Sequence, residues 1–402
     1  MDATLKYARN LCKYVLLALL VGAVCGAVGT LFYHAVALAT GLRKAHPWLL
    51  YLLPGAGLLT AYLYALLKME RDPGTDAVLL AAKESGAVPA RQAALIFSGT
   101  FLTHLCGGSA GREGAALQIG GGLGAALSKL LKLSKGETRL VTMCGMSAVF
   151  SAVFGTPLTA AVFSIEVASV GVISSTAVLP CVLSSLTASY IARLLGAEAE
   201  AYVLQGVPAL NVESLLPALV LGLVCALVSI LFCEVMHASH RLFGKIANRY
   251  LRVLAGSVLV AGVSLLVGVG RYNGAGADVI AGALAGEALP WDGIVKLLLT
   301  AITMGCGMKG GEIVPAFFVG STMGCLLGPL VGLSPSFGAA LCMVGLFCGV
   351  VNCPIASVLL SMELFGGAGL PLFALCCAVS FACSGRHSLY SAQSFVFDKV
   401  NI

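Results

Sequence analysis

Long apolar runs separated by short polar links dominate the chain. The first two, residues 14–33 and 48–67, are each 20 residues long, about what a straight helix needs to cross a bilayer. Later runs are mostly shorter and begin or end at Gly or Pro, which predicts helices that stop inside the membrane. The pattern therefore predicts an all-α polytopic membrane protein with broken helices. The later runs cover residues 93–106, 115–131, 141–154, 157–169, 172–195, 215–235, 253–269, 294–308, 313–330, 337–351, 354–365 and 370–383.

The composition argues against a water-soluble particle. Hydrophobic residues make up 59% of the 402 residues and charged residues 10%, against roughly 25% charged in soluble proteins. A soluble enzyme, a nucleic-acid-binding protein and a disordered scaffold all need more polar surface than this. The net charge of +6 is spread over many short links, where positive residues report topology. Lys6, Arg9 and Lys13 precede the first apolar run, so we expect a cytoplasmic N-terminus.

Two stretches of the chain repeat each other at a shift of 200 residues. The segment from Gly107 to Gly124 aligns without gaps on the segment from Gly307 to Gly324. The aligned pairs are Gly107 and Gly307, Gly111 and Gly311, Ala116 and Ala316, Gly120 and Gly320, and Gly124 and Gly324. A second match aligns residues 155–166 with residues 352–363. Transporters are commonly built from such repeats, with the substrate site at the repeat interface.

The repeats predict one transmembrane domain covering residues 1–402, with repeats of about 14–200 and 210–395. Each glycine-rich stretch precedes an apolar helix, one beginning near Ala115 and the other near Val314 and Pro315. The free amides and partial positive charge at a helix N-terminus form an anion site. Glycines that only permit close helix packing are the alternative interpretation. Because the feature recurs in both halves, the sequence favours a site.

Three charged residues interrupt these apolar loops: Arg112, Glu113 and Glu312. An ionisable residue inside a membrane is costly and indicates a functional role. An ionised carboxylate at an anion-binding helix end occupies the position of the anion, and a protonated one can leave it. One residue can thus couple anion movement to proton movement. The alternative is a salt bridge between Arg112 and one of the two glutamates, which we expect for Arg112.

Several motifs resemble those of the CLC anion channel and transporter family. Residues 111–114, Gly-Arg-Glu-Gly, followed by Gln118-Ile-Gly-Gly, resemble the GREGP…QIGG signature. Gly311-Glu-Ile-Val-Pro315 resembles the GxFxP loop, and Gly155-Thr-Pro-Leu158 resembles an NAPL-type helix start. Leu389-Tyr-Ser-Ala392 resembles the C-terminal segment that carries the central tyrosine. The resemblance spans about residues 74–395.

This resemblance implies an inverted-repeat helical fold and a homodimer with one anion pathway in each subunit. It implies that Glu113 is the gating glutamate and that the Tyr390 hydroxyl faces the central anion. The amides of Ile313 and Val314 are expected to face the same anion. An interfacial aromatic is the alternative interpretation of Tyr390. The expected anion-binding residues are Tyr390, Thr75, Gly111, Gly114, Ile313 and Val314.

Departures from the chloride pattern indicate a branch of the family. The serine motif GSGIP is absent, and residues 74–78 at the matching distance offer Thr75 as its candidate. The proton-relay glutamate of chloride/proton exchangers would stand at Val167. Glu312 gives a GGE sequence that resembles the fluoride/proton antiporter branch, where the second functional carboxylate lies in this loop. That branch often has Thr at the position of Val314, so coordination of the anion by a side-chain hydroxyl at this position is absent in this chain.

The sequence therefore predicts a membrane antiporter that exports fluoride in exchange for protons. Fluoride is a strong hydrogen-bond acceptor, which a protonated Glu or a Tyr hydroxyl suits. We expect Glu113 to be protonated from outside and to swing inward, where Glu312 takes part in proton transfer. A multi-pass protein of the cell (plasma or inner) membrane with both termini cytoplasmic is expected. No cytoplasmic regulatory domain, metal, cofactor or nucleic-acid partner is expected.

The closest alternative is a chloride channel or a chloride/proton exchanger of the same fold. An intramembrane enzyme is disfavoured because no Ser-His or His-Glu pair recurs in the repeated loops, and an assembly protein has no use for duplicated charged loops. Glu234, His237 and His240 could bind metal, but the neighbouring basic residues favour a solvated helix end. Glu166 and Glu363 are interpreted as paired structural or subunit-contact groups.

Overall fold

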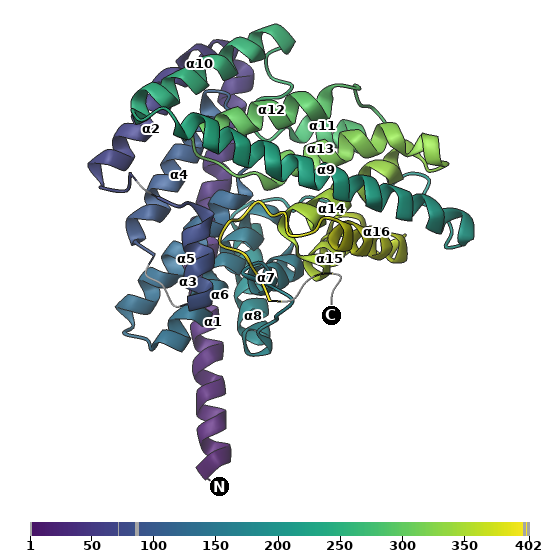
Figure 1. The fold of residues 1–402 in the computed structure, drawn as a ribbon. Coiled ribbons are helices and arrows are strands. Elements are labelled where there is room, and N and C mark those ends of the chain that lie inside the picture. The colour runs from purple at the N-terminus through teal and green to yellow at the C-terminus, as the bar shows by residue number, and fades with distance from the viewer. Residues whose placement is uncertain (1, 71, 85–87, 397–398, 400–402) are drawn as a thin grey trace.

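The computed structural model describes residues 2–70, 72–84, 88–396 and 399 and is built almost entirely of α-helices (Figure 1). Its first half contains a 3₁₀ turn and the helices α1 to α8. Their bounds are α1 Asp2–Ala45, η1 Pro47–Leu52, α2 Leu53–Leu66, α3 Thr75–Glu84, α4 Ala90–Leu105, α5 Glu113–Leu130, α6 Lys135–Phe154, α7 Pro157–Glu166 and α8 Ser175–Leu194.

The second half repeats this order of helices. Long α9 corresponds to α1, α10 to α2, and so on to α16, which corresponds to α8 (Figure 1). The bounds are α9 Val212–Gly244, α10 Arg249–Val267, α11 Ala277–Leu284, α12 Asp292–Gly305, α13 Ile313–Leu327, η2 Pro329–Val331, α14 Pro335–Val351, α15 Pro354–Phe365 and α16 Leu370–Cys383. The predicted all-helical repeat fold is confirmed.

Equivalent helices make equivalent contacts in the two halves. In the first half α5 packs on α6 and α1 packs on α8, while in the second α13 packs on α14 and α9 packs on α16. The start of the third-last helix of each half is also repeated, because Ser134 caps α6 and Ser334 caps α14 at the same 200-residue shift. Each half is thus one copy of the same helical unit.

The two halves meet through short helices that do not cross a bilayer. At about 1.5 Å per residue, the 10 residues of α7 and the 12 of α15 reach only part of a hydrocarbon core about 30 Å thick. Each short helix carries, in its last turn, a glutamate that caps the start of the other. Glu363 accepts from the backbone N–H groups of Leu158 and Thr159, and Glu166 accepts from those of Ile355 and Ala356, at 2.8 to 3.2 Å.

Helix lengths differ from the predicted apolar runs at particular places. Within the part of the chain that the structure describes, five helical stretches are long and apolar enough to span a membrane, among them α1, which continues well beyond the run 14–33 at both ends. The short helices α3 and α11 lie outside the predicted runs because polar residues interrupt their apolar pattern. Both of them lie just before the helix that leads into a glycine-rich loop.

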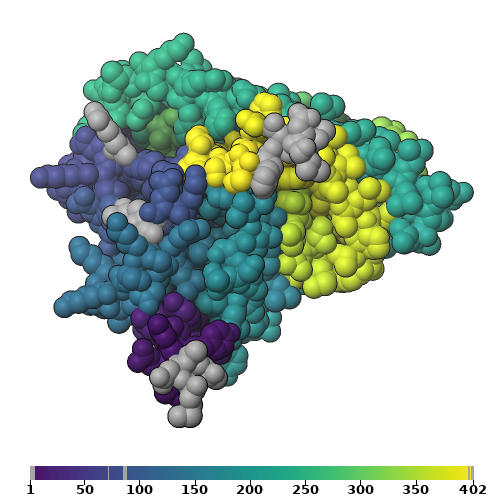
Figure 2. Space-filling model, turned by 60° about the horizontal axis from the view of Figure 1, so that its bottom comes forward, coloured from purple at the N-terminus to yellow at the C-terminus, as the bar shows by residue number. Residues whose placement is uncertain are grey.

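The C-terminal segment returns to the junction between the halves. Strand β2, Ser394–Phe395, pairs in parallel with β1, Ser169–Val170, which follows α7. In Figure 2 the yellow C-terminal residues lie against first-half residues in blue and teal and second-half residues in green. Residues from both halves therefore surround the segment that carries Tyr390.

Candidate functional site

The two glycine-rich loops meet head to head at the centre of the molecule. The N–H of Gly111 donates to the carbonyl of Gly311 at 2.7 Å, and the N–H of Gly311 donates back to Gly111 at 2.9 Å. This reciprocal antiparallel bridge is what two loops related by an approximate two-fold axis make. It brings the first turns of α5 and α13 together, so the two predicted anion-binding helix starts form one site.

Glu113 is the first residue of α5 and is only 1% exposed. Its Oε2 accepts from the backbone N–H of Arg112 at 2.9 Å, so the carboxylate folds back over the start of its own helix. A Cβ atom at Gly111 would lie 2.7 Å from this oxygen, which explains why the loop has glycine there. Within the described residues Oε1 has no hydrogen-bond partner, although Nε of Arg112 lies 3.6 Å away.

Glu312 precedes the first residue of α13 and is half-buried. Its carboxylate packs against the start of the other helix, since a Cβ atom at Gly114 would lie 3.4 Å from Glu312 Oε2 and 3.1 Å from Gly311 Cα. Glycine at 114 thus allows the second carboxylate and the opposing loop to approach α5. The site holds two carboxylates, one from each half, on either side of the glycine bridge.

Glu113 lines a large cavity of about 1070 Å³, here named the Glu113 cavity. It also receives Val314 from α13 and the start of α11. Its polar wall carries several cations and acids: Arg43, Lys44, His104, Arg112, Glu200, Arg271, Asp278 and Glu287. One of the two carboxylates therefore faces an open, charged cavity.

Glu312 lines a second cavity of about 690 Å³, the Glu312 cavity, which also receives Thr75 and Tyr390. Thr75 is the first residue of α3, and its Oγ1 accepts from Nε2 of Gln118 at 3.1 Å, so the hydroxyl hydrogen can serve another acceptor. The Tyr390 hydroxyl is buried and has no partner in the part of the chain that is described. The hydroxyls of Thr75 and Tyr390 and the Glu312 carboxylate thus share this cavity, which the acids Glu70, Asp72 and Asp76 also line.

Gln393 holds the Tyr390 segment in place with all of its amide atoms. Its Nε2 donates to the carbonyls of Val167 and Val351 at 2.9 and 2.8 Å, and its Oε1 accepts from Asn352 and Ser388. Val167 directly follows α7 in the first half, and Val351 is the last residue of α14 in the second. One side chain therefore fixes the tyrosine segment to both halves.

A buried lysine supports the first glycine-rich loop from behind. Lys296 on α12 is fully buried, and its Nζ donates to the carbonyls of Tyr272 and Gly274 at 3.1 and 2.6 Å. Gly274 in turn exchanges backbone hydrogen bonds with Gly108 and Ala110 in the loop. The Lys296 ammonium thus holds residues 272–274 in place, and these residues in turn support the first glycine-rich loop.

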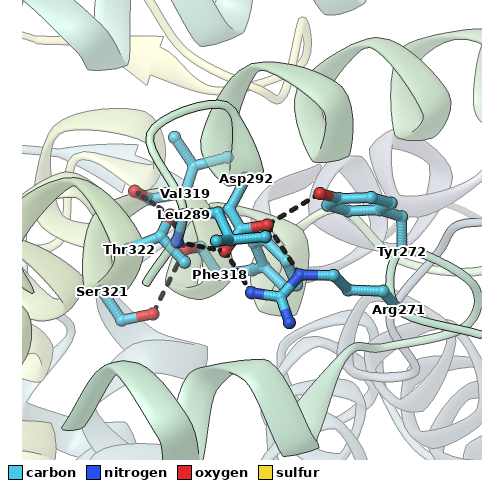
Figure 3. Close-up of polar contacts among 8 residues, drawn as sticks. All are labelled: Arg271, Tyr272, Leu289, Asp292, Phe318, Val319, Ser321 and Thr322. Carbon is cyan, nitrogen blue, oxygen red and sulfur yellow. Dashed lines mark hydrogen bonds and ion pairs between the residues drawn. The ribbon is translucent and has the colours of Figure 1, made fainter. Parts of the chain in front are cut away.

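Asp292 fixes the beginning of that same supporting segment. Figure 3 shows its carboxylate between Leu289 on one side and Arg271 and Tyr272 on the other. Arg271 forms a bidentate ion pair with the Asp292 carboxylate at 2.8 and 2.6 Å. The hydroxyl of Tyr272 and the N–H of Leu289 each donate to the same carboxylate at 2.8 Å. All polar capacity of this buried carboxylate is used, which is typical of a structural group.

Comparison with known proteins decides the family. The model of the voltage-gated chloride channel family, CLC, matches residues 56–385, most of the chain. This chain belongs to the CLC family. A chloride/fluoride channel protein from Pseudomonas syringae pv. tomato is 34% identical over 392 residues, which cover 95% of this chain and 86% of that protein. The predicted family is confirmed.

Solved CLC structures confirm the fold. A CLC-type fluoride/proton antiporter superposes with a TM-score of 0.92 at 32% identity, covering 96% of this chain and 98% of the other. A slow cyanobacterial Cl⁻/H⁺ antiporter gives a TM-score of 0.80 at 18% identity over 92% and 94% of the two chains. An H⁺/Cl⁻ exchange transporter from Vibrio cholerae is 26% identical over 87% of this chain and 81% of its own length.

The structure distributes the residues expected from the sequence between two cavities. Thr75, Tyr390 and Glu312 line one, whereas Glu113 and Val314 line the other. The remaining expected residues lie in the wall between them: Gly111, Gly114 and fully buried Ile313. The side chains of Val314 and Tyr390 thus line different cavities, whereas the expected contact of the Ile313 and Val314 backbone amides with the anion stays a prediction.

Several site residues escaped sequence reasoning. Lys296 could have been found, because it is an ionisable residue inside the apolar run 294–308. Glu200, which pairs with Arg112 at 3.1 Å, and Gln393 carry no such signal because their partners are distant in sequence. Arg112 does form the expected ion pair with Glu113, but its shorter contact is with Glu200.

The two other residue groups noted in the sequence occupy distinct places. Glu166 and Glu363 form the reciprocal caps described above, as their structural interpretation expects. His237 and His240 on α9 line the Glu312 cavity. Glu234 instead lies within 3.6 Å of both Arg241 and His387.

Proposed function

We propose that this CLC protein is a membrane antiporter that exports fluoride in exchange for protons. The observation that carries the proposal is the pair of carboxylates, Glu113 and Glu312, which face two different cavities on either side of the Gly111–Gly311 bridge. A channel for anions alone has no need of a proton-accepting group on both sides of its narrowest point. The similar fluoride/proton antiporter and chloride/fluoride channel protein support the same choice of anion.

Glu113 acts as the gate in the proposed mechanism. Its carboxylate accepts an N–H at the start of α5, which is the kind of position an anion takes at a helix N-terminus. Protonation removes the negative charge, weakens this hydrogen bond and lets fluoride take the place of the carboxylate. A fluoride ion and a proton on Glu113 therefore alternate at one position.

Glu312, Thr75 and Tyr390 serve the other side of the proposed pathway. The unpartnered hydroxyl of Tyr390 and the free hydroxyl hydrogen of Thr75 can donate to fluoride, a strong acceptor. Glu312 receives the proton that Glu113 brings and releases it into the Glu312 cavity. Val167 is fully buried and apolar, so no carboxylate is available for a relay at that position.

The proposed setting is the cell membrane, with the Glu312 cavity toward the cytoplasm and both termini on that side. Multi-pass insertion itself follows from the family and the apolar spans. We propose that two copies form a homodimer through the face that carries α7 and α15, because these short helices expose Leu158, Ile355 and Met362. Chemical cross-linking in liposomes tests this, with a dimer expected and a monomer contradicting it.

Efflux from liposomes tests the function. Vesicles loaded with fluoride or with chloride are placed in a proton gradient, and the anion and pH are recorded for the wild type, Glu113→Gln and Glu312→Gln. We expect the wild type to show proton-coupled fluoride efflux and both variants to lose the coupling to protons. The control Glu198→Gln, which changes an exposed residue, is expected to behave as the wild type. Chloride flux of equal size would instead identify a less selective exchanger, and fluoride flux indifferent to protons would identify a channel.

A further inference from the structure

The guanidinium of Arg112 is shared between two carboxylates, and the shorter contact is not with the gate. Nη2 of Arg112 donates to Oε1 of Glu200 at 3.1 Å. The approach of Nε to Oε1 of Glu113, 3.6 Å, is too long for a hydrogen bond. Oε1 of Glu113 is consequently buried without a hydrogen-bond partner among the described residues. Arg112 is thus committed to Glu200 and only loosely to Glu113.

Glu200 lies on the connector between α8 and α9, residues 195–211, and the connector is firmly attached. The N–H of Tyr202 donates to the carbonyl of Leu364 at 2.9 Å. The N–H of Gln205 donates to Ser336, and its carbonyl accepts from Ser334, at 3.0 and 2.7 Å. Glu200 therefore occupies a fixed position, unlike the long side chains of most surface ion pairs.

Arg112 is equally well held. Its guanidinium lies 4.8 Å from the centre of the Tyr33 ring on α1, and its side chain is only 13% exposed. Glu113 is nearly inaccessible, while the Glu200 side chain is 31% exposed. The three groups form a row from solvent to the interior: Glu200, Arg112 and Glu113.

We propose that Glu200 is a positioning residue that sets the pH at which Glu113 takes up its proton. Glu200 draws the positive charge of Arg112 away from Glu113 and places a second negative charge beside it. Both effects disfavour an ionised Glu113, so the gate is protonated at a higher pH than it would be without Glu200. The inference rests on the proposed function of Glu113 as the proton-carrying gate.

Other charged groups around the Glu113 cavity are engaged elsewhere. Lys44 pairs with Asp278 at 2.6 Å, and Arg271 pairs with Asp292 at 2.6 Å. Arg43 on α1 donates to the carbonyl of His104, which is on α4. Among the described residues, the remaining titratable groups around Glu113 are His104 on α4, Tyr202 in the connector, Tyr390 in the C-terminal segment, Glu312 before α13 and Glu287 before α12.

The pairing also has a consequence for anion release. When protonated Glu113 leaves the start of α5, Arg112 keeps Glu200 as its partner. The guanidinium is then largely neutralised and does not hold fluoride strongly as the anion passes into the Glu113 cavity. Without the Glu200 charge, Arg112 would bind both the ionised gate and the departing anion more tightly.

The test measures fluoride efflux from liposomes over a series of pH values, equal on both sides so that protein orientation does not matter. In Glu200→Gln the pH of half-maximal efflux is expected to fall by about one unit, with efflux recovering in acid. Glu198→Gln, an exposed acid two residues away on the same connector, is expected to keep the wild-type profile. Glu200→Asp, which retains the charge, is expected to stay closer to wild type than Glu200→Gln.

Three results would overturn the proposal. An unchanged profile in Glu200→Gln, or an equal shift in Glu198→Gln, would refute the role of Glu200 while leaving proton-coupled export intact. If Glu200→Asp shifts as far as Glu200→Gln, the side-chain shape and not its charge matters, and the proposal is wrong. A wild-type efflux with no pH dependence would refute both this role and the proposed function.

Discussion

The two glycine-rich loops share one backbone arrangement but carry their carboxylates one position apart. Glu113 of the first loop aligns with Ile313 of the second, and Glu312 aligns with Arg112. The loops are bonded to each other symmetrically through Gly111 and Gly311. A one-residue offset in otherwise equivalent loops therefore accompanies the placement of one loop carboxylate on each cavity.

The supports of the two loops differ as well. The first loop is backed by Lys296, whose ammonium is satisfied by carbonyls in a fully buried place. The second loop contains Lys309, which lies 3.6 Å from Asp72 and 4.2 Å from the Tyr64 ring centre, on the wall of the Glu312 cavity. The first loop is thus supported from behind by a lysine in buried internal contacts, whereas the lysine of the second loop lies on the wall of a polar cavity suited to water.

The largest effect on transport is expected when Glu113 of the first loop is replaced by isoleucine, the residue at the aligned position 313 of the second loop. Glu113→Ile removes the proton-accepting group and keeps a side chain of similar size. Proton flux is expected to fall by roughly 100-fold, because a positioned proton-transfer group is lost. Parallel fluoride and pH recordings from liposomes measure it. Ile313→Val is the control, and a variant that still moves protons with fluoride would contradict the role of Glu113.

Removing the brace of the first loop should lower stability. Lys296→Met leaves the carbonyls of Tyr272 and Gly274 without their donor, at a net cost of about 2 kcal/mol in the free energy of unfolding. Thermal unfolding in detergent measures the change. Lys44→Met, which breaks an exposed pair with Asp278, should cost less than about 0.5 kcal/mol. Equal losses of stability in both variants would show that Lys296 does not support the first loop.

A smaller effect distinguishes the two cavities. Helix α3 begins with Thr75 on the Glu312 cavity, whereas its counterpart α11 begins with Ala277 on the Glu113 cavity. Thr75→Val removes a hydroxyl donor worth about 1 kcal/mol, so the KM for fluoride should rise roughly fivefold. Thr75→Ser should retain the wild-type KM. If valine and serine behave alike, the hydroxyl does not contact the anion.

The smallest effect concerns the caps of α6 and α14, which lie at equivalent positions. Lys13 and, to a smaller extent, Ser134 hydrogen-bond Glu137 and lower the pKa of this carboxyl from 4.5 to about 2, whereas Phe337 stands at the equivalent place in the second half. Because the pKa of Glu137 is lower in the folded state than in the unfolded state, its ionised carboxylate stabilises the fold at pH values above the unfolded-state pKa. This stabilisation is lost as pH falls from about 4.5 toward 2. Thermal unfolding of Glu137→Gln should lack this dependence, and a variant that kept it would contradict the assignment.

Much of the fold could be predicted because its signals are local. The repeated glycines and the prolines at 157 and 354 mark helix starts that depend on backbone geometry alone. The bounds of α15 and α16 match the predicted runs because Pro and Gly delimit them. The helix α3 was not predicted, because Asp76 and Lys83 interrupt its apolar pattern.

The site could be predicted only in part. Glu113 and Glu312 stand out in sequence because they are charged residues in apolar surroundings. Which cavity each one faces depends on tertiary packing and could not be predicted. The contacts of Glu200 and Gln393 join segments 88 and more than 200 residues apart, so no local pattern contains them.

The most direct test of the account is whether a fluoride gradient alone moves protons uphill. Liposomes loaded with fluoride and set to the same pH inside and outside are diluted into fluoride-free buffer, with the membrane potential held at zero, and internal pH is followed. The account predicts acidification of the interior as fluoride leaves, absent in Glu113→Gln. Fluoride loss with no change of internal pH in the wild type would contradict it.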